Sequence, residues 1–184
     1  ELCFGIAAAL DGESEGPGPI DIAGALDGRS DPITILEAVV LEGCIGETLS
    51  ALIAVAARDA ATDPSVRAAL DEIANDELSH AELAWSTVAW ARSTGAPEVV
   101  RAIDATFARA LPQGDDVADP DVPAERLHQL GRLTQREREA VMTRGFEIVV
   151  RPLAAALRDG AARVEAPLAV ARTAVRSHRP ASPA

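Results

Sequence analysis

The segment ATDPSVRAALDEIANDELSHAELAWSTVAWA, residues 61–91, decides the fold of this chain. It opens with Thr62-Asp63-Pro64, in which a capping residue precedes a proline suited to the first helical position. Apolar residues then recur at steps of three or four, which is the spacing of one face of an α-helix. The segment therefore predicts a long amphipathic helix over about 64–94, ended by the glycine and proline that follow.

The apolar face of this predicted helix has one gap, between Ile73 and Ala81. Glu77 and His80 fill the gap, and residues three apart project side by side from a helix. We therefore expect both side chains to point into the core. Burying a carboxylate and an imidazole is costly unless they are paired or bind a metal. In helical bundles, Glu-x-x-His with a Glu from a neighbouring helix is a ligand pattern of di-iron and di-manganese sites.

The preceding segment supplies the neighbouring helix, predicted over about 32–61. The turn between the two helices is short, so we expect them to pack antiparallel. Glu47 lies 15.5 residues before the centre of this turn, and the midpoint of Glu77 and His80 lies 16 residues after it. Glu42 would lie roughly 7 Å too far along the axis, at about 1.5 Å per residue. The predicted metal ligands are therefore Glu47, Glu77 and His80, with Glu42 as an outer group or a partner for an arginine.

The rest of the chain predicts further helices and no strand, so the fold class is all-α. Residues 1–11 resemble the end of a helix, and the Gly- and Pro-rich residues 12–30 predict a loop. The remaining expected elements are a helix over 98–111, an acidic loop over 112–123, a short helix over 124–131, a helix over 135–158 that Pro152 should kink, and a weakly structured tail over 159–184. The helical domain is thus predicted to span 1–158. Thr134 and Glu137 form an expected capping box.

Several other residues could carry chemistry but have a simpler interpretation. His128 is expected on the surface, and Glu147 is expected to pair with an arginine of another helix. Trp85 and Trp90 are expected to be packing anchors. His178 falls in the tail and carries no prediction of a site.

Charge and composition exclude some classes of function. The 184 residues suffice for one domain, and the net charge of −12 disfavours nucleic acids and anionic membranes as partners. Glu37, Glu42 and Glu47 interrupt the most apolar stretch, so no membrane helix is predicted. Two cysteines, Cys3 and Cys44, are too few for a disulfide framework and are expected to be reduced and buried. With no visible signal sequence, a cytoplasmic location is expected.

Four stretches resemble a known family, and the resemblance is specific in two of them. LEGCIGETLSAL, residues 41–52, and the segment 61–91 are similar to the second half of a bacterial ferritin-like, di-iron carboxylate domain family. The opening ELCFGIAAALDG resembles the segment that follows the first Glu-x-x-His of such proteins, and EIVVRPLAAAL at 147–157 resembles their C-terminal helix. The resemblance implies an antiparallel four-helix bundle with extra C-terminal helices, and ligand roles for Glu47, Glu77 and His80.

The resemblance also implies an incomplete bundle, because the first Glu and Glu-x-x-His of the family pattern are absent. An internal similarity between residues 1–12 and 82–95 agrees with this, since both begin Glu-Leu-x-aromatic and both contain a glycine near the end. We expect a truncated N-terminal helix pair. A homodimer through the exposed bundle face is the other arrangement that would supply six ligands.

The sequence thus supports two hypotheses of function. In the first, the chain is a non-haem iron protein, with manganese as the second candidate metal. Its complete site would carry out O₂-linked redox or ferroxidase-type chemistry, although whether it is an enzyme stays open. In the second, the chain is a metal-free helical bundle that serves as a structural or interaction module, with Glu77 and His80 as an internal hydrogen-bonded pair.

Overall fold

The computed structural model describes residues 2–12, 16, 18–24, 31–112 and 121–159. These residues form helices and no strand, which confirms the all-α class. The elements are α1 (Leu2–Asp11), α2 (Pro32–Ala38), η1 (Val39–Glu47), α3 (Thr48–Ala60), α4 (Pro64–Ser93), α5 (Pro97–Arg109), α6 (Ala124–Gln129), α7 (Gln135–Gly145), η2 (Phe146–Val150) and α8 (Arg151–Arg158), where η marks a π-helical segment. The predicted tail, apart from its first residue, and much of the two predicted long loops lie outside the described residues.

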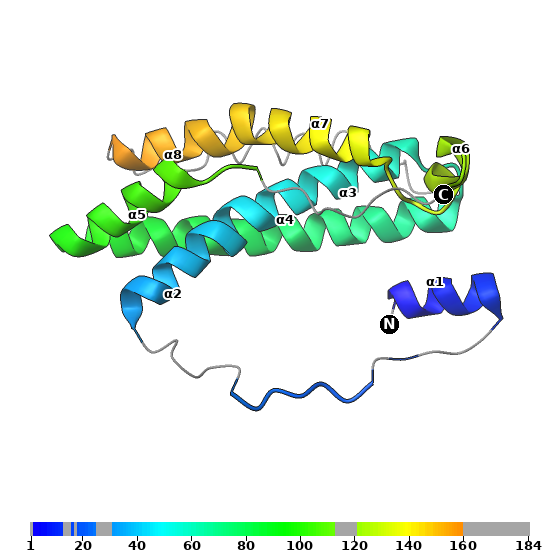
Figure 1. Ribbon diagram of the computed structural model, residues 1–184, viewed down its shortest axis with the longest axis horizontal. Coiled ribbons are helices and arrows are strands. Elements are labelled where there is room, and N and C mark those ends of the chain that lie inside the picture. Colours follow the sequence, from blue (N-terminus) through cyan, green and yellow to red (C-terminus); the bar gives the residue numbers. More distant parts are fainter. Residues whose placement is uncertain (1, 13–15, 17, 25–30, 113–120, 160–184) are drawn as a thin grey trace, which may run out of the picture.

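Three long rods make up the body of the molecule (Figure 1). The first is the unbroken run α2–η1–α3, and α4 returns antiparallel beside it, as expected from the short turn between them. The third rod, α7–η2–α8, lies on the side of α3, while the shorter α5 packs near the start of the first rod. Helix α1 lies beside α4 on the side away from α7 (Figure 1).

Side-chain caps explain where the long helices begin. Asp31 accepts a hydrogen bond from the Thr34 backbone N–H and starts α2. Asp63 accepts from two backbone N–H groups of the first turn of α4. Thr134 and Glu137 form the predicted capping box of α7. Each cap satisfies N–H groups that have no partner inside the helix.

The core is the shared interior of α4, the first rod and the third rod. Trp85 is fully buried, stacks on Phe107 with ring centroids 5.4 Å apart, and donates its indole N–H to the Thr48 hydroxyl at 3.1 Å. The Thr48 hydroxyl in turn donates to the Cys44 carbonyl at 2.6 Å. Cys44 is a free, buried thiol, as expected, and its burial raises the thiol pKa. The side chain of Cys3 lies outside the described residues.

The two π-helical segments are the main departure from the predicted helices. η1 ends at Glu47, and η2 ends two residues before Pro152. Proline has no N–H and its ring crowds the carbonyl four residues earlier, so a wider turn accommodates it within a continuous helix. A bend at Pro152 was expected from sequence, whereas the structure shows that η2 precedes it and α8 continues the helix.

Predictions about three single residues are wrong in whole or in part. Trp90 is 68% exposed and is not a packing anchor, because it lies on the face of α4 opposite to the core. His128 is half-buried: its Nε2 lies 3.0 Å from Oε2 of Glu137, so α6 is tied to the capping box of α7. Hydrogen bonds from His128 and Thr134 lower the pKa of Glu137 to about 2. Glu147 does pair with an arginine, but with Arg151 on the same rod.

The run Pro32–Ala60 is long and apolar enough to cross a membrane by length and composition alone, with a mean hydropathy of 1.8. Nevertheless, 44% of its most apolar window is buried against other helices of this chain. Part of this run, including Val40, Cys44 and Leu49, therefore contributes to the core.

Close contact between the first two rods generates a prediction for Gly43. A Cβ at Gly43 would lie 2.6 Å from the Ala84 Cβ, and an alanine methyl group cannot move aside. We expect Gly43→Ala to lower the free energy of unfolding by about 1–3 kcal/mol, the usual cost of overpacking. Chemical denaturation measures this change.

Gly46 is the matched control, because a Cβ there would come no closer than 3.4 Å to the Leu41 carbonyl oxygen. Gly46→Ala should be neutral or stabilising, since alanine favours helix. Gly43→Ala combined with Ala84→Gly should recover most of the lost stability. An undiminished loss in the double variant would contradict the close contact.

Candidate metal centre

The structure brings together the three side chains predicted as metal ligands. Glu47 is the last residue of η1, and Glu77 and His80 lie near the middle of α4. One ligand atom of each residue lies within 4.8 Å of the others. The His80 Nδ1 is 3.9 Å from Oε2 of Glu47 and 3.9 Å from Oε2 of Glu77. Among the described residues, no other set of three His, Cys, Asp or Glu side chains meets this spacing.

Glu47 rather than Glu42 joins the group, in agreement with the count of residues from the turn. Glu42 is exposed in the first turn of η1 and takes no part in the cluster. The counting works because the first rod ends and the antiparallel α4 begins close to the turn, so residues equally far from the turn reach the same height.

The expectation that Glu77 and His80 point into the core is wrong. The His80 side chain is 55% exposed, and those of Glu47 and Glu77 are 33% and 29% exposed. The residues that α4 buries against its neighbours include Ala74, Leu78 and Ala81. Glu77 lies at the edge of that surface, and His80 lies roughly 60° further round the helix at 100° per residue. The cluster is therefore a half-open site on the flank of the helix pair.

Contact with the Glu47 carboxyl changes the protonation of Glu77. A hydrogen bond with the Glu47 carboxyl, partial burial and the Glu47 charge raise the pKa of Glu77 to about 7, while His80 acts in the opposite direction. The pair therefore shares a proton near neutral pH, as two adjacent carboxyl groups do when nothing else neutralises them. A cation lying between them would replace that proton.

A small cavity of about 280 Å³ adjoins the cluster at Glu77. Ser50 and Ile73 form part of its wall, and Arg138 reaches it from α7. Nothing in the sequence marks Arg138 as part of a site, because an arginine on a capped, charged helix is ordinarily a surface residue. Only the packing of α7 on α3 brings it here.

Comparison with protein-family models, with curated proteins and with solved structures finds no match for this chain.

The shared proton generates a prediction about pH. The ordinary glutamate pKa is 4.5 and that of Glu77 in the folded chain is about 7, so the folded chain holds this proton more tightly than the unfolded chain. The metal-free protein should therefore lose stability as the pH rises from about 4.5 to about 7. Glu77→Gln should remove this loss, because it keeps the hydrogen bond to Glu47 without a second charge.

Thermal unfolding between pH 5 and pH 8 in the presence of a chelator tests this expectation. Glu72→Gln, at an exposed position of the same helix, is the control and should keep the wild-type dependence. Titration of Glu137 falls at lower pH and does not interfere. If Glu77→Gln and wild type lost stability equally over this range, the shared proton would be ruled out.

Proposed function

We propose that Glu47, Glu77 and His80 are the ligands of one half of a dinuclear iron or manganese carboxylate centre in a ferritin-like helical bundle. The complete centre would serve O₂-linked redox or ferroxidase-type chemistry. The observation that carries the proposal is the convergence of two carboxylates and an imidazole within 4.8 Å from two antiparallel helices.

The donor set fits such ions. Carboxylates bind hard divalent cations and can bridge two of them, and neutral imidazole is a ligand that suits iron. The carboxyl group of Glu77, raised in pKa by its neighbour, would give up its proton to a cation and so bind it with the charge that the ion requires. When bound, such a metal pair would supply electron transfer to or from oxygen.

The protein side of the proposed site follows from the fold. Glu47 and Glu77 would face the metal from opposite helices and offset its charge, and His80 would act as a terminal ligand one turn along α4. The π-helical segment that ends at Glu47 also supports the proposal, since π-segments inside α-helices occur frequently at functional sites. Three ligands hold one ion weakly, so a tight dinuclear centre requires further donors.

A metal-free interaction module is the second candidate function. Leu83 and Trp90, 69% and 68% exposed on the outer face of α4, favour it. Large exposed apolar side chains of this kind are suited to contact with another protein. In this case Glu77 and Glu47 would remain a proton-sharing pair with no ion between them.

Metal binding separates the two candidates. We expect the wild-type chain to bind Fe²⁺ or Mn²⁺ under anaerobic conditions in a pH-dependent manner, with affinity falling below pH 7 as the Glu77 carboxyl takes up its proton. Glu77→Ala and His80→Ala should each weaken binding roughly tenfold to a hundredfold, the range for losing an interaction of a few kcal/mol. Equilibrium titration with Co²⁺ as a coloured substitute provides an optical readout of the ligand field.

Glu42→Ala is the matched control, because it removes an exposed carboxylate from the same rod without touching the cluster. It should bind metal as the wild type does. If all four proteins bound metal equally weakly, or if Glu42→Ala were as impaired as His80→Ala, the metal centre would be rejected in favour of the interaction module.

A further inference from the structure

The outer face of α4 combines carboxylates with large apolar side chains. Leu83 and Trp90 lie on it and are 69% and 68% exposed. Glu72 and Asp76 are exposed nearer the start of the helix, and at 100° per residue all four lie within roughly 40° of one another. A hollow of about 450 Å³ follows this acidic half and is lined by Glu72, Ile73, Asn75, Asp76 and Ser79. The described residues thus leave uncovered a surface that is acidic at one end and apolar at the other.

The chain contains a segment of complementary composition after its last described residue. Residues 160–184 hold four arginines and one glutamate, a net charge of +3, so residues 1–159 carry −15 within the total of −12. Three apolar residues of this segment recur at helical spacing, and three arginines follow the same repeat beside them: Leu168, Ala171 and Val175, and Arg172, Arg176 and Arg179. The pattern is that of a basic amphipathic helix.

The apolar residues of the two surfaces have the same spacing. Leu83 and Trp90 are seven residues apart, which is roughly 10 Å along a helix. Leu168 and Val175 are also seven residues apart. In an antiparallel alignment Leu168 lies beside Trp90. Val175 then lies beside Leu83, so both exposed side chains of α4 gain an apolar partner.

The charges favour the same antiparallel alignment. It brings Arg179 level with Ser79, within one turn of Asp76 and at the acidic half of the face. A parallel alignment of the same apolar residues would carry Arg179 to the end of α4, where it would lie far from Asp76.

The position of α8 makes this alignment possible. Helix α8 ends at the same end of the bundle as α4 (Figure 1), and Leu157 shares a core cluster with Ala91. An antiparallel segment has to begin at this end. Nine residues lead from Asp159 to Leu168 and can span up to roughly 30 Å, which suffices to pass two helices of about 10–12 Å diameter.

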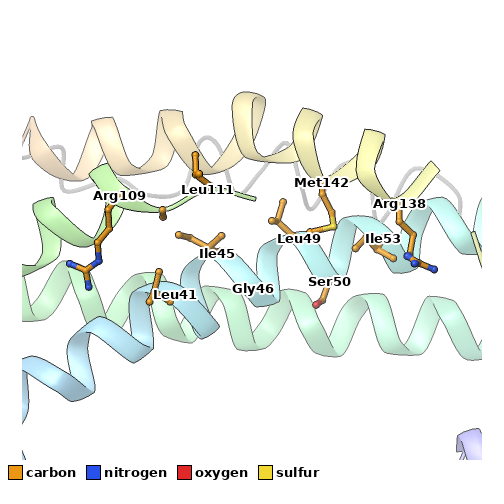
Figure 2. Close-up of a pocket in the computed structure, with 11 residues that line it drawn as sticks. Leu41, Ile45, Gly46, Leu49, Ser50, Ile53, Arg109, Leu111, Arg138 and Met142 are labelled. Carbon is orange, nitrogen blue, oxygen red and sulfur yellow. The ribbon is translucent and has the colours of Figure 1, made fainter. Parts of the chain in front are cut away.

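Charge also argues against two other pairings. A cavity of about 710 Å³ between the first rod and α7 is another large apolar surface (Figure 2). Its lining residues include Arg109 and Arg138 and no carboxylate, so further arginines would meet charges of their own sign there. A second copy of the chain is a poor match for the outer face of α4, because residues 1–159 of that copy carry the same charge of −15.

We propose that residues 168–179 dock as an antiparallel helix on the outer face of α4, with Leu168 beside Trp90 and Arg179 toward Asp76. The docked segment would also cover His80, which lies three residues before Leu83, and so would close the exposed side of the cluster. The docking contacts involve no candidate metal ligand, so the inference does not depend on the metal centre.

Acrylamide quenching of tryptophan fluorescence in the full chain, with a chelator present, tests the docking. Trp85 is fully buried, so quenching reports mainly on Trp90. The wild type should be shielded. Leu168→Glu should raise quenching to the level of a side chain that is 68% exposed, because it places a charge where Trp90 requires an apolar partner.

Val170→Glu is the matched control. It introduces the same charge two residues away, at a position that points roughly 160° from Leu168 in a helix. It should leave the shielding of Trp90 unchanged. Circular dichroism of both variants checks that each is folded.

Disulfide cross-linking tests the alignment. Ala171 comes level with Thr87 in the antiparallel arrangement, so Thr87→Cys with Ala171→Cys should form a disulfide within one chain under mild oxidation. Cys3→Ser in the same protein removes a competing thiol. The control pair is Thr143→Cys with Ala171→Cys, because Thr143 is exposed on α7 and lies outside the proposed docking face. This pair should form little disulfide.

A charge exchange tests the acidic end of the face. Arg179→Glu should lower the disulfide yield of the Thr87 and Ala171 pair roughly twofold to fivefold, the range for losing one exposed ion pair. Adding Asp76→Arg should restore the yield, since the two charges are then reversed together.

Three outcomes would overturn the proposal. The first is quenching of Trp90 in the wild type that equals quenching in Leu168→Glu. The second is loss of shielding in Val170→Glu as large as in Leu168→Glu. The third is a disulfide that joins two chains and does not form within one, because a second copy would then occupy the face. Loss of metal binding with docking intact would reject only the metal centre.

Discussion

The contact between the first rod and α4 is the interaction on which the rest of the structure depends. Gly43 lets the two helices approach closely at Ala84, and the buried hydrogen bond from Trp85 to Thr48 ties them together next to Glu47. Trp85 has no other described hydrogen-bond acceptor, so moving the helices apart would leave its buried N–H without a partner at a cost of about 1–3 kcal/mol. A slide by one turn, about 5.4 Å, would separate Glu47 from Glu77 and His80.

The π-helical segment η1 affects the contact between the first rod and α4 next to the metal-ligand candidates, because it ends at Glu47. An i→i+5 turn contains about one more residue than an α-turn, which rotates every later side chain by about 100° relative to an ideal helix. Glu47 is the last residue of η1, so the direction in which its side chain points around the helix depends on η1. Its position along the helix axis depends instead on the turn before α4. The segment is held in place because Val40, Cys44 and Ile45 are buried within it.

The parts of the fold that local chemistry determines could be predicted from sequence. Asp31, Asp63 and Thr134 are caps that act within a few residues, and they place the starts of α2, α4 and α7 correctly. The position of Glu47 level with Glu77 and His80 along the helix axes could also be predicted, because this height depends on an antiparallel pair and a short turn. These features require no knowledge of which face each helix buries.

What could not be predicted depends on distant packing. The 3.6-residue repeat locates an apolar face to within about one residue, and Glu77 and His80 lie at its edge, so the pattern alone could not show that His80 is exposed. Trp90 lies outside the core for the same reason, although Trp85, five residues earlier, is fully buried. The bond between His128 and Glu137 joins two helices across an intervening turn, and no local pattern signals it.

The partial exposure of the cluster of Glu47, Glu77 and His80 limits how strongly it could attract a cation by itself. Water screens charges that are half-exposed, so two carboxylates and an imidazole at this flank attract a cation far less strongly than the same groups in a dry interior. Near neutral pH the cation must also displace the proton shared by Glu47 and Glu77. Any element that covered this flank would remove water from the ligands and strengthen their attraction for the metal. The same cover would raise the cost of leaving the cluster empty, because the carboxylates would then be buried without a neutralising charge. A site of this design would therefore bind metal tightly only when its cover and its metal are present together.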